Sequence, residues 1–123
     1  MSKKVINPER IRRINSGFSF IPHRFLTDGF LESLNQLELL LYFFLILAAD
    51  KDGLSYYSYE KICQSLGMNL DEYMRARDSL LMKDLIAFDN TLFQVLELPP
   101  RPKSTSDIGR LIKETLKEAY YAR

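Results

Sequence analysis

The sequence is poor in the residues that usually carry catalytic and metal-binding chemistry. Its 123 residues include one cysteine, Cys63, and one histidine, His23. A single cysteine cannot close an internal disulfide, so nothing in the composition indicates an oxidising compartment. One histidine with one cysteine gives no metal site of familiar spacing, and no Ser-His-Asp set can be argued around it. The sequence therefore predicts neither an enzyme nor a bound cofactor.

Long apolar runs, glycine-rich loops and a leader of the secretory type are also missing. The longest apolar run, residues 39–49, falls short of the roughly 20 residues that a membrane-spanning helix needs. The five glycines are scattered, which excludes a Gly-rich phosphate loop. The opening MSKKVINPERIRR lacks the apolar segment of a signal peptide. We expect a cytoplasmic protein without a membrane partner.

The net charge of +1 conceals an uneven distribution along the chain. Residues 1–24 carry +5, residues 25–98 carry −7 and residues 99–123 carry +3. An acidic body therefore carries two basic arms, a pattern that is informative about partners and not about fold. Either the arms bind a polyanion, or they are charged simply to remain solvated.

Capping signals divide the central part of the chain into helices. Asn35 with Glu38, and Asn69 with Glu72, have the spacing of capping boxes. The helix expected over residues 36–49 is apolar nearly all round, so it is either buried on most sides or half of an oligomer interface. Ser58 can cap a helix that ends before Gly67, and glycine suits the left-handed backbone of a tight turn. The sequence thus predicts two helices joined by a short turn.

The flanking segments complete the pattern. A loose arm is expected over residues 1–17, a short helix over about 22–32, and a short strand at LSYY, residues 54–57. LIAFDNTLFQVLEL reads as a β-hairpin that turns at residues 89–91. A proline-rich linker at 100–106 leads to residues 107–123, whose apolar residues recur at helical spacing. We therefore expect an α+β, mainly α, winged helix-turn-helix domain over residues 18–99.

Four stretches carry a resemblance to a known family: FIPHRFL, LELLLYFFLILAADKDGLSYYS, YEKICQSLGMNLDEYMRARDSLLMKDLI and FQVLELP. In this order they resemble bacterial winged-helix domains of replication and mobile-element proteins, such as the N-terminal domain of the primosomal protein DnaD and related plasmid or phage initiators. The resemblance covers about residues 18–99. It implies DNA binding or the assembly of a replication complex, with a replication or mobile-element protein as a further partner, and it implies no catalysis.

The candidate DNA-binding residues follow from this fold. The second helix of the motif should lie in the major groove, with its first turn at the base edges. That turn holds Leu70, Asp71 and Glu72, whose carboxylates either cap the helix and complement its dipole or accept a hydrogen bond from cytosine. The basic candidates are Arg75, Arg77 and Lys83 on the helix, and Arg10, Arg12, Arg13, Arg101 and Lys103 on the arms. The acidic tip of the hairpin favours a structural role, so we expect the arms to carry most of the DNA affinity.

Three alternatives stay open. The domain is either a DNA-binding module or a protein-interaction module, because an acidic body favours basic partners. A homodimer is expected through the helix at 36–49 or through the C-terminal helix, unless the latter packs on its own domain. The tyrosines at positions 56, 57 and 59 either stack on bases or, as is more common for such a cluster, fill a seam between sheet and helix.

Overall fold

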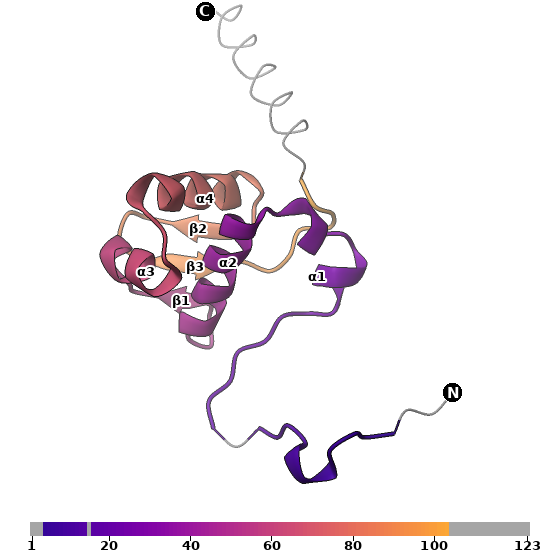
Figure 1. Cartoon of the computed structure of the whole chain (residues 1–123). Helices are drawn as coiled ribbons and strands as arrows, with labels where there is room; N and C mark the ends of the chain where they lie inside the picture. Colours follow the sequence, from indigo (N-terminus) through magenta and orange to yellow (C-terminus); the bar gives the residue numbers. More distant parts are fainter. Residues whose placement is uncertain (1–3, 15, 104–123) are drawn as a thin grey trace, which may run out of the picture.

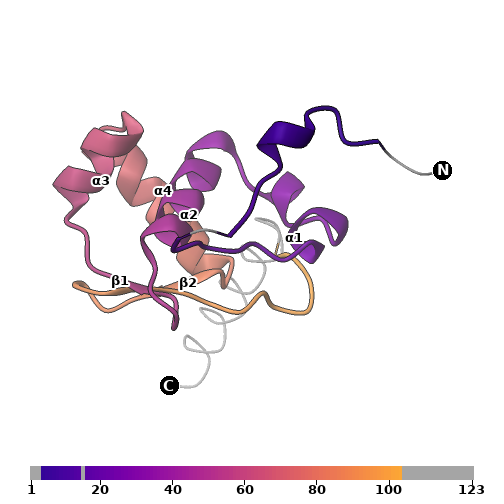
Figure 2. The same ribbon diagram turned by 90° about the horizontal axis from the view of Figure 1, so that it is seen from below.

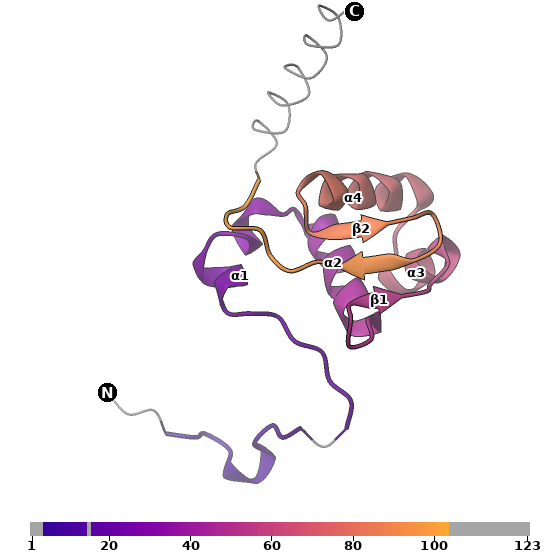
Figure 3. The same cartoon turned by 180° about the vertical axis from the view of Figure 1, so that it is seen from behind.

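The computed structural model describes residues 4–14 and 16–103, within which three helices cover one face of a small sheet. The helices are α2 (Gln36–Ala48), α3 (Tyr59–Leu66) and α4 (Leu70–Met82). The strands are β1 (Leu54–Ser55), β2 (Ile86–Phe88) and β3 (Phe93–Val95). Seen from behind, the strands lie in front of the helices (Figure 1; Figure 3). A helix-turn-helix followed by a β-hairpin is a winged helix, so the predicted fold class is confirmed.

The segment ahead of this body differs from the expectation. The single helix expected over about 22–32 is wrong, because the chain forms α1 (Arg24–Thr27) and the 3-10 turn η2 (Leu31–Ser33) instead. Between them Gly29 has a φ of +86°, a left-handed backbone that ends a right-handed helix and that glycine adopts at little cost. The break allows Phe25 and Phe30 both to be buried in the core.

Both predicted capping boxes are present. Asn35 accepts a hydrogen bond from the Glu38 N–H at 2.9 Å, and Glu38 accepts one from the Asn35 N–H at 2.8 Å. Asn69 and Glu72 form the same reciprocal pair at 2.8 and 3.0 Å. Each box satisfies two N–H groups that the first turn of a helix would otherwise leave unpaired. These local bonds determine where α2 and α4 begin.

The turn between α3 and α4 depends on Gly67. Its φ of +66° is left-handed, and its N–H donates to the carbonyl of Cys63 as α3 ends. The Met68 N–H donates to the same carbonyl at 3.1 Å, and the Met68 side chain is buried. The turn therefore closes α3 and directs the chain into α4 at a fixed angle, as the sequence predicts.

The sheet is antiparallel, with strand order β1-β3-β2. Phe93 of β3 lies opposite Ser55 on one side and Phe88 on the other. Gly53 precedes β1, and a Cβ atom added there would lie 2.6 Å from the carbonyl oxygen of Val95. The close approach of β1 to β3 thus requires glycine at this position. The hairpin β2–β3, which is the wing, turns at Asn90 with a φ of +79°.

The core lies between α2, α3, α4 and the covered face of the sheet (Figure 2). Its most deeply buried side chains include Leu41, Leu45, Ile62, Leu80 and Phe93. Burying a side chain of this size contributes about 1.5–3 kcal/mol to folding. The apolar surface of α2 is mostly used inside its own domain, and Leu40 and Leu47 are its exposed large apolar residues. No helix of the described residues is both long and apolar enough to span a bilayer.

Candidate nucleic-acid interface

The second helix of the motif, α4, has a buried face and an exposed face. Tyr73, Ala76 and Leu80 are buried, which confirms the stripe that the sequence predicts. The exposed side chains of its first two turns are Leu70, Asp71, Met74 and Arg75. Glu72 points back to complete the capping box, so the structure shows a capping role for this carboxylate. The surface that α4 offers to a ligand is therefore part apolar and part charged.

Both arginines on α4 pair with an aspartate of the same helix. The Arg75 guanidinium lies 3.1 Å from the Asp71 carboxylate, and both side chains are highly exposed. Arg77 lies 3.1 Å from Asp78. It is more buried than Arg75, because its guanidinium sits 5.5 Å from the ring centres of both Tyr73 and Phe88. The two arginines are thus present at the predicted face, but each is already partly neutralised.

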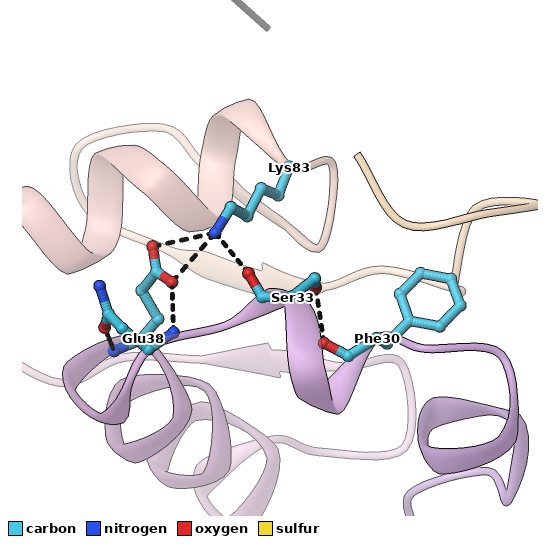
Figure 4. A network of polar contacts seen from close by, with 5 residues as sticks. Phe30, Ser33, Glu38 and Lys83 are labelled. Atoms are coloured by element: carbon cyan, nitrogen blue, oxygen red, sulfur yellow. Dashed lines mark hydrogen bonds and ion pairs between the residues drawn. The ribbon is translucent and has the colours of Figure 1, made fainter. Parts of the chain in front are cut away.

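Lys83 lies elsewhere, which corrects the expectation that it faces DNA (Figure 4). Its side chain is buried, and its Nζ donates to both carboxylate oxygens of Glu38 at 3.0 and 3.3 Å and to the carbonyl of Ser33 at 2.8 Å. A buried ammonium needs such partners because leaving water is costly. Lys83 therefore ties the end of α4 to the start of α2 and has no free donor direction toward a surface ligand.

The Glu38 carboxylate is correspondingly stabilised in its charged form. Burial raises the pKa of Glu38, but the other contributions outweigh it. These are the hydrogen bonds from Ser79, from the Asn35 backbone and from Lys83, together with the Lys83 charge. The pKa of Glu38 consequently lies below its ordinary value, so this carboxylate is ionised near neutral pH.

The basic side chains of the N-terminal arm point into solvent. Arg10, Arg12 and Arg13 are exposed, and the arm holds one 3-10 turn, η1 (Pro8–Arg10), capped by Asn7. The arm runs away from the body (Figure 1). The eleven residues from 4 to 14, at about 3.5 Å each, span at most about 40 Å when fully extended, about twice the roughly 20 Å length of α4. An arm of this reach can follow a ligand that is held at α4.

The second basic segment starts from the same end of the body as α1. The guanidinium of Arg24 donates to the carbonyls of Leu98, Pro99 and Pro100 at 3.3, 2.8 and 3.2 Å. Arg24 thus fixes the exit of the chain from β3, a role that no local sequence signal reveals because the partners are about 75 residues away. Beyond the residues that Arg24 holds, Arg101 is exposed, and the Lys103 ammonium lies 3.6 Å from the Asp84 carboxylate. The helix expected at 107–123 lies outside the described residues.

The tip of the wing has the structural role that the sequence favours. Asp89 accepts hydrogen bonds from the N–H groups of Leu92 and Thr91 at 2.6 and 2.9 Å. These bonds, with the one from Leu92 the larger cause, lower the pKa of Asp89. The connection from 89 to 92 contains no basic side chain. The wing therefore contributes shape and not positive charge to this face.

The tyrosine cluster at positions 56, 57 and 59, where α3 begins, is exposed and does not fill a seam, which corrects the more common interpretation of such a cluster. Tyr56 is 70% exposed and Tyr59 48% exposed, and Tyr57 keeps an edge contact with Phe44. The three rings line a hollow of about 510 Å³ between α4 and the wing. Tyr73, Leu70, Met74 and Arg77 line its α4 side, and Phe88, Asn90 and Thr91 line its wing side.

One comparison, with a family model, agrees with the helix-turn-helix part of this architecture. A family model described as a helix-turn-helix domain matches residues 31–86, a range that contains α2, α3 and α4. A solved structure, "Structure of Rep-DNA complex", is 20% identical; the likeness covers 82% of this chain and 88% of that one, with a TM-score of 0.46. A comparison with curated proteins gave no match. The chain thus contains a winged helix-turn-helix domain, carried between basic segments.

Proposed function

We propose that the protein is a non-catalytic DNA-binding protein whose basic arms supply most of the affinity. The observation that carries this proposal is the exposed face of α4 in a winged helix-turn-helix, combined with free arginines at 10, 12 and 13. In this class of fold the second helix enters the major groove, while arms reach phosphates or the minor groove. Phosphate neutralisation dominates affinity, and α4 with its paired arginines offers little of it.

The assignment of contacts follows from exposure. Arg10, Arg12 and Arg13 neutralise phosphates from the N-terminal arm. Arg101 does so from the C-terminal segment, and Lys103 joins it by giving up a pairing with Asp84 that is partly exposed and therefore weak. Arg75 contacts DNA from α4 when its ion pair with Asp71 is replaced by an ion pair with a phosphate. Arg77 stays stacked over the rings of Tyr73 and Phe88. Lys83 is not part of this interface.

The test is a fluorescence anisotropy titration of a labelled duplex with the full chain. The proposal expects tight binding at low salt and a large loss of affinity when Arg10, Arg12 and Arg13 are all changed to Gln. Glu9→Gln is the matched control, because it removes the one negative charge of this arm instead of its positive charges. It should strengthen DNA binding. Failure of the full chain to bind any DNA at low salt would refute the proposed function.

The process proposed for this binding is bacterial replication, transcription control or mobile-element maintenance, in the cytoplasm. It is supported by the resemblance of residues 18–99 to winged-helix domains of replication and mobile-element proteins. A homodimer, formed through the exposed Leu40 and Leu47 of α2 or through residues 107–123, belongs to the same proposal. Light scattering at micromolar concentration tests the dimer, and a monomeric mass would contradict it.

A second function is favoured by one observation, the pairing of both arginines on α4 with aspartates. Together with a charge of −7 over residues 25–98, this pairing suits a module that binds a basic protein partner. Salt separates the two functions. DNA binding through several phosphates weakens steeply as salt rises, whereas binding through an apolar surface does not.

A further inference from the structure

The hollow between α4 and the wing exposes more aromatic surface than the fold requires. Its three flanking tyrosines, at positions 56, 57 and 59, are all exposed at 42% or more, and Leu70 and Met74 beside them are exposed at 49% and 41%. Contiguous exposed apolar surface of this kind usually marks a binding site. The wing tip and α3 lie at the same end of the body (Figure 3), and Tyr59 of α3 lines the same hollow as Asn90 and Thr91 of the wing.

We propose that this hollow binds unpaired bases of single-stranded DNA by stacking them on its tyrosines. The proposal rests on the DNA-binding function proposed above and names the form of DNA that the body prefers. Every base has a π face, and stacking on aromatic side chains is the usual way in which proteins hold single strands. In a duplex those faces are covered by the neighbouring base pairs, so only unpaired bases can enter such a site.

The rings differ in how free they are. Arg77 lies 5.5 Å from the ring centres of Tyr73 and Phe88, and therefore already occupies a face of each. Tyr57 is held against Phe44 at 5.3 Å in an edge-to-face arrangement. Tyr56, at 70%, and Tyr59, at 48%, are the most exposed rings of the set, and Tyr59 makes a more distant contact with Tyr73, with ring centres 6.4 Å apart. We therefore assign the stacking to Tyr56 and Tyr59.

The remaining groups of the lining suit a nucleotide. Asn90 and Ser58 offer hydrogen-bonding groups of the kind that read base edges, and Arg77 offers positive charge for a phosphate. No residue of the lining is acidic. A cationic peptide would find no carboxylate in the lining to pair with, and the neighbouring Asp78 carboxylate is already paired with Arg77 at 3.1 Å, so the lining favours a nucleic acid over a basic protein.

The acids that surround the hollow are already engaged. Asp71 is paired with Arg75, and Asp78 with Arg77, each at 3.1 Å. Asp89 accepts two backbone N–H groups at the wing tip. Glu60 accepts a hydrogen bond from the Tyr59 hydroxyl, and this bond raises the pKa of Tyr59. These pairings limit the repulsion that an entering strand would meet.

The test uses the full chain with labelled oligothymidylate and a labelled duplex of equal length, each titrated at the same salt. Changing both Tyr56 and Tyr59 to Ala should weaken single-strand binding by about thirtyfold or more, because each of the two stacked bases contributes at least about fivefold to the affinity. Duplex binding, which depends on the arms, should change by less than about twofold. Changing both residues to Phe keeps the rings and should restore single-strand binding. Leu26→Ala on α1, also an exposed apolar residue, is the control and should change neither affinity.

The outcomes separate this inference from the proposed function. If the Ala variant binds the single strand as tightly as the unchanged chain, or loses single-strand and duplex binding equally, the stacking proposal is overturned while DNA binding stands. If the unchanged chain binds neither form of DNA, the proposed function fails first. Loss of binding in the Phe variant as well would also overturn stacking, because it would assign the contact to the hydroxyl groups.

Discussion

The ion pair between Glu38 and Lys83 shows how burial determines the role of a charged residue. Both side chains are less than 10% exposed, with a shortest N–O distance of 3.0 Å. The pair joins the first turn of α2 to the end of α4, and a third bond from Lys83 holds the carbonyl of Ser33 in η2. Removing one partner of such a pair leaves the other as an uncompensated buried charge, whereas replacing both partners with uncharged residues leaves no buried charge.

Lys83→Ala should therefore lower the free energy of unfolding by about 3–5 kcal/mol, the usual cost of orphaning a buried partner. Urea denaturation followed by circular dichroism measures it. The double change of Glu38→Gln with Lys83→Met keeps the volume and leaves no unpaired charge, so it should be less destabilising than Lys83→Ala. A Lys83→Ala variant with unchanged stability would show that this contact is not formed in solution.

The pH dependence of stability should carry the signature of Glu38. Its pKa in the folded protein lies below the ordinary value of 4.5, so the unfolded chain binds this proton more tightly. The stabilisation is therefore present above about pH 4.5 and is lost as pH falls through the lower folded pKa. The stability difference between the wild-type protein and Glu38→Gln, measured by denaturation from pH 7 to 3, should shrink over that interval. A difference that stays constant with pH would contradict this assignment.

Among the structural elements, two glycine turns fix the positions of the helices and strands that form the interface. Gly67 orients α4 after α3, and a Cβ atom there would meet nothing within 4 Å. Gly53 brings β1 against β3, where a Cβ atom would collide with the Val95 carbonyl. Both have positive φ values, but only Gly53 combines that backbone with a close approach.

Gly67→Ala should cost about 1–2 kcal/mol, because its only penalty is the left-handed backbone. Gly53→Ala should cost more, since the backbone of β3 must also move. Thermal unfolding of the two variants side by side measures the difference, and Gly17→Ala serves as the control, because Gly17 has no positive φ and no atom near its Cβ position. Equal losses at Gly53 and Gly67 would contradict the steric argument.

The elements that the sequence predicts correctly are those specified by neighbouring residues. The Asn35–Glu38 and Asn69–Glu72 boxes and the glycine at 67 act within a few residues, so the pattern alone locates α2, α3 and α4. The features that it misses depend on distant partners. The burial of Lys83 depends on pairing with Glu38, which is 45 residues away in the sequence. The tyrosines at positions 56, 57 and 59 face a hollow that exists only once the wing has folded beside α4.

At the scale of the whole molecule, the acidic body and the basic arms have separate roles. The body has α4 arginines that are already paired, an aromatic hollow whose one charged lining residue is Arg77, and a wing tip without basic residues. The N-terminal arm has three exposed arginines and one acid among the described residues. Under the proposed function, long-range attraction to a polyanion would come mainly from the arms, while the body would determine which form of DNA fits. We therefore expect DNA binding to depend strongly on salt, and we expect the preference between single-stranded and duplex DNA to depend on the hollow.

The dependence of the DNA association constant on salt tests this account most directly. For duplex DNA the slope of log K against log salt concentration is about −0.9 per neutralised phosphate. Changing Arg10, Arg12 and Arg13 to Gln should therefore make the slope shallower by about 2.7 if all three contact phosphates. Arg75→Gln should change it by no more than about 0.9. A slope that is unchanged in the triple variant would contradict the central claim that the arms carry the affinity.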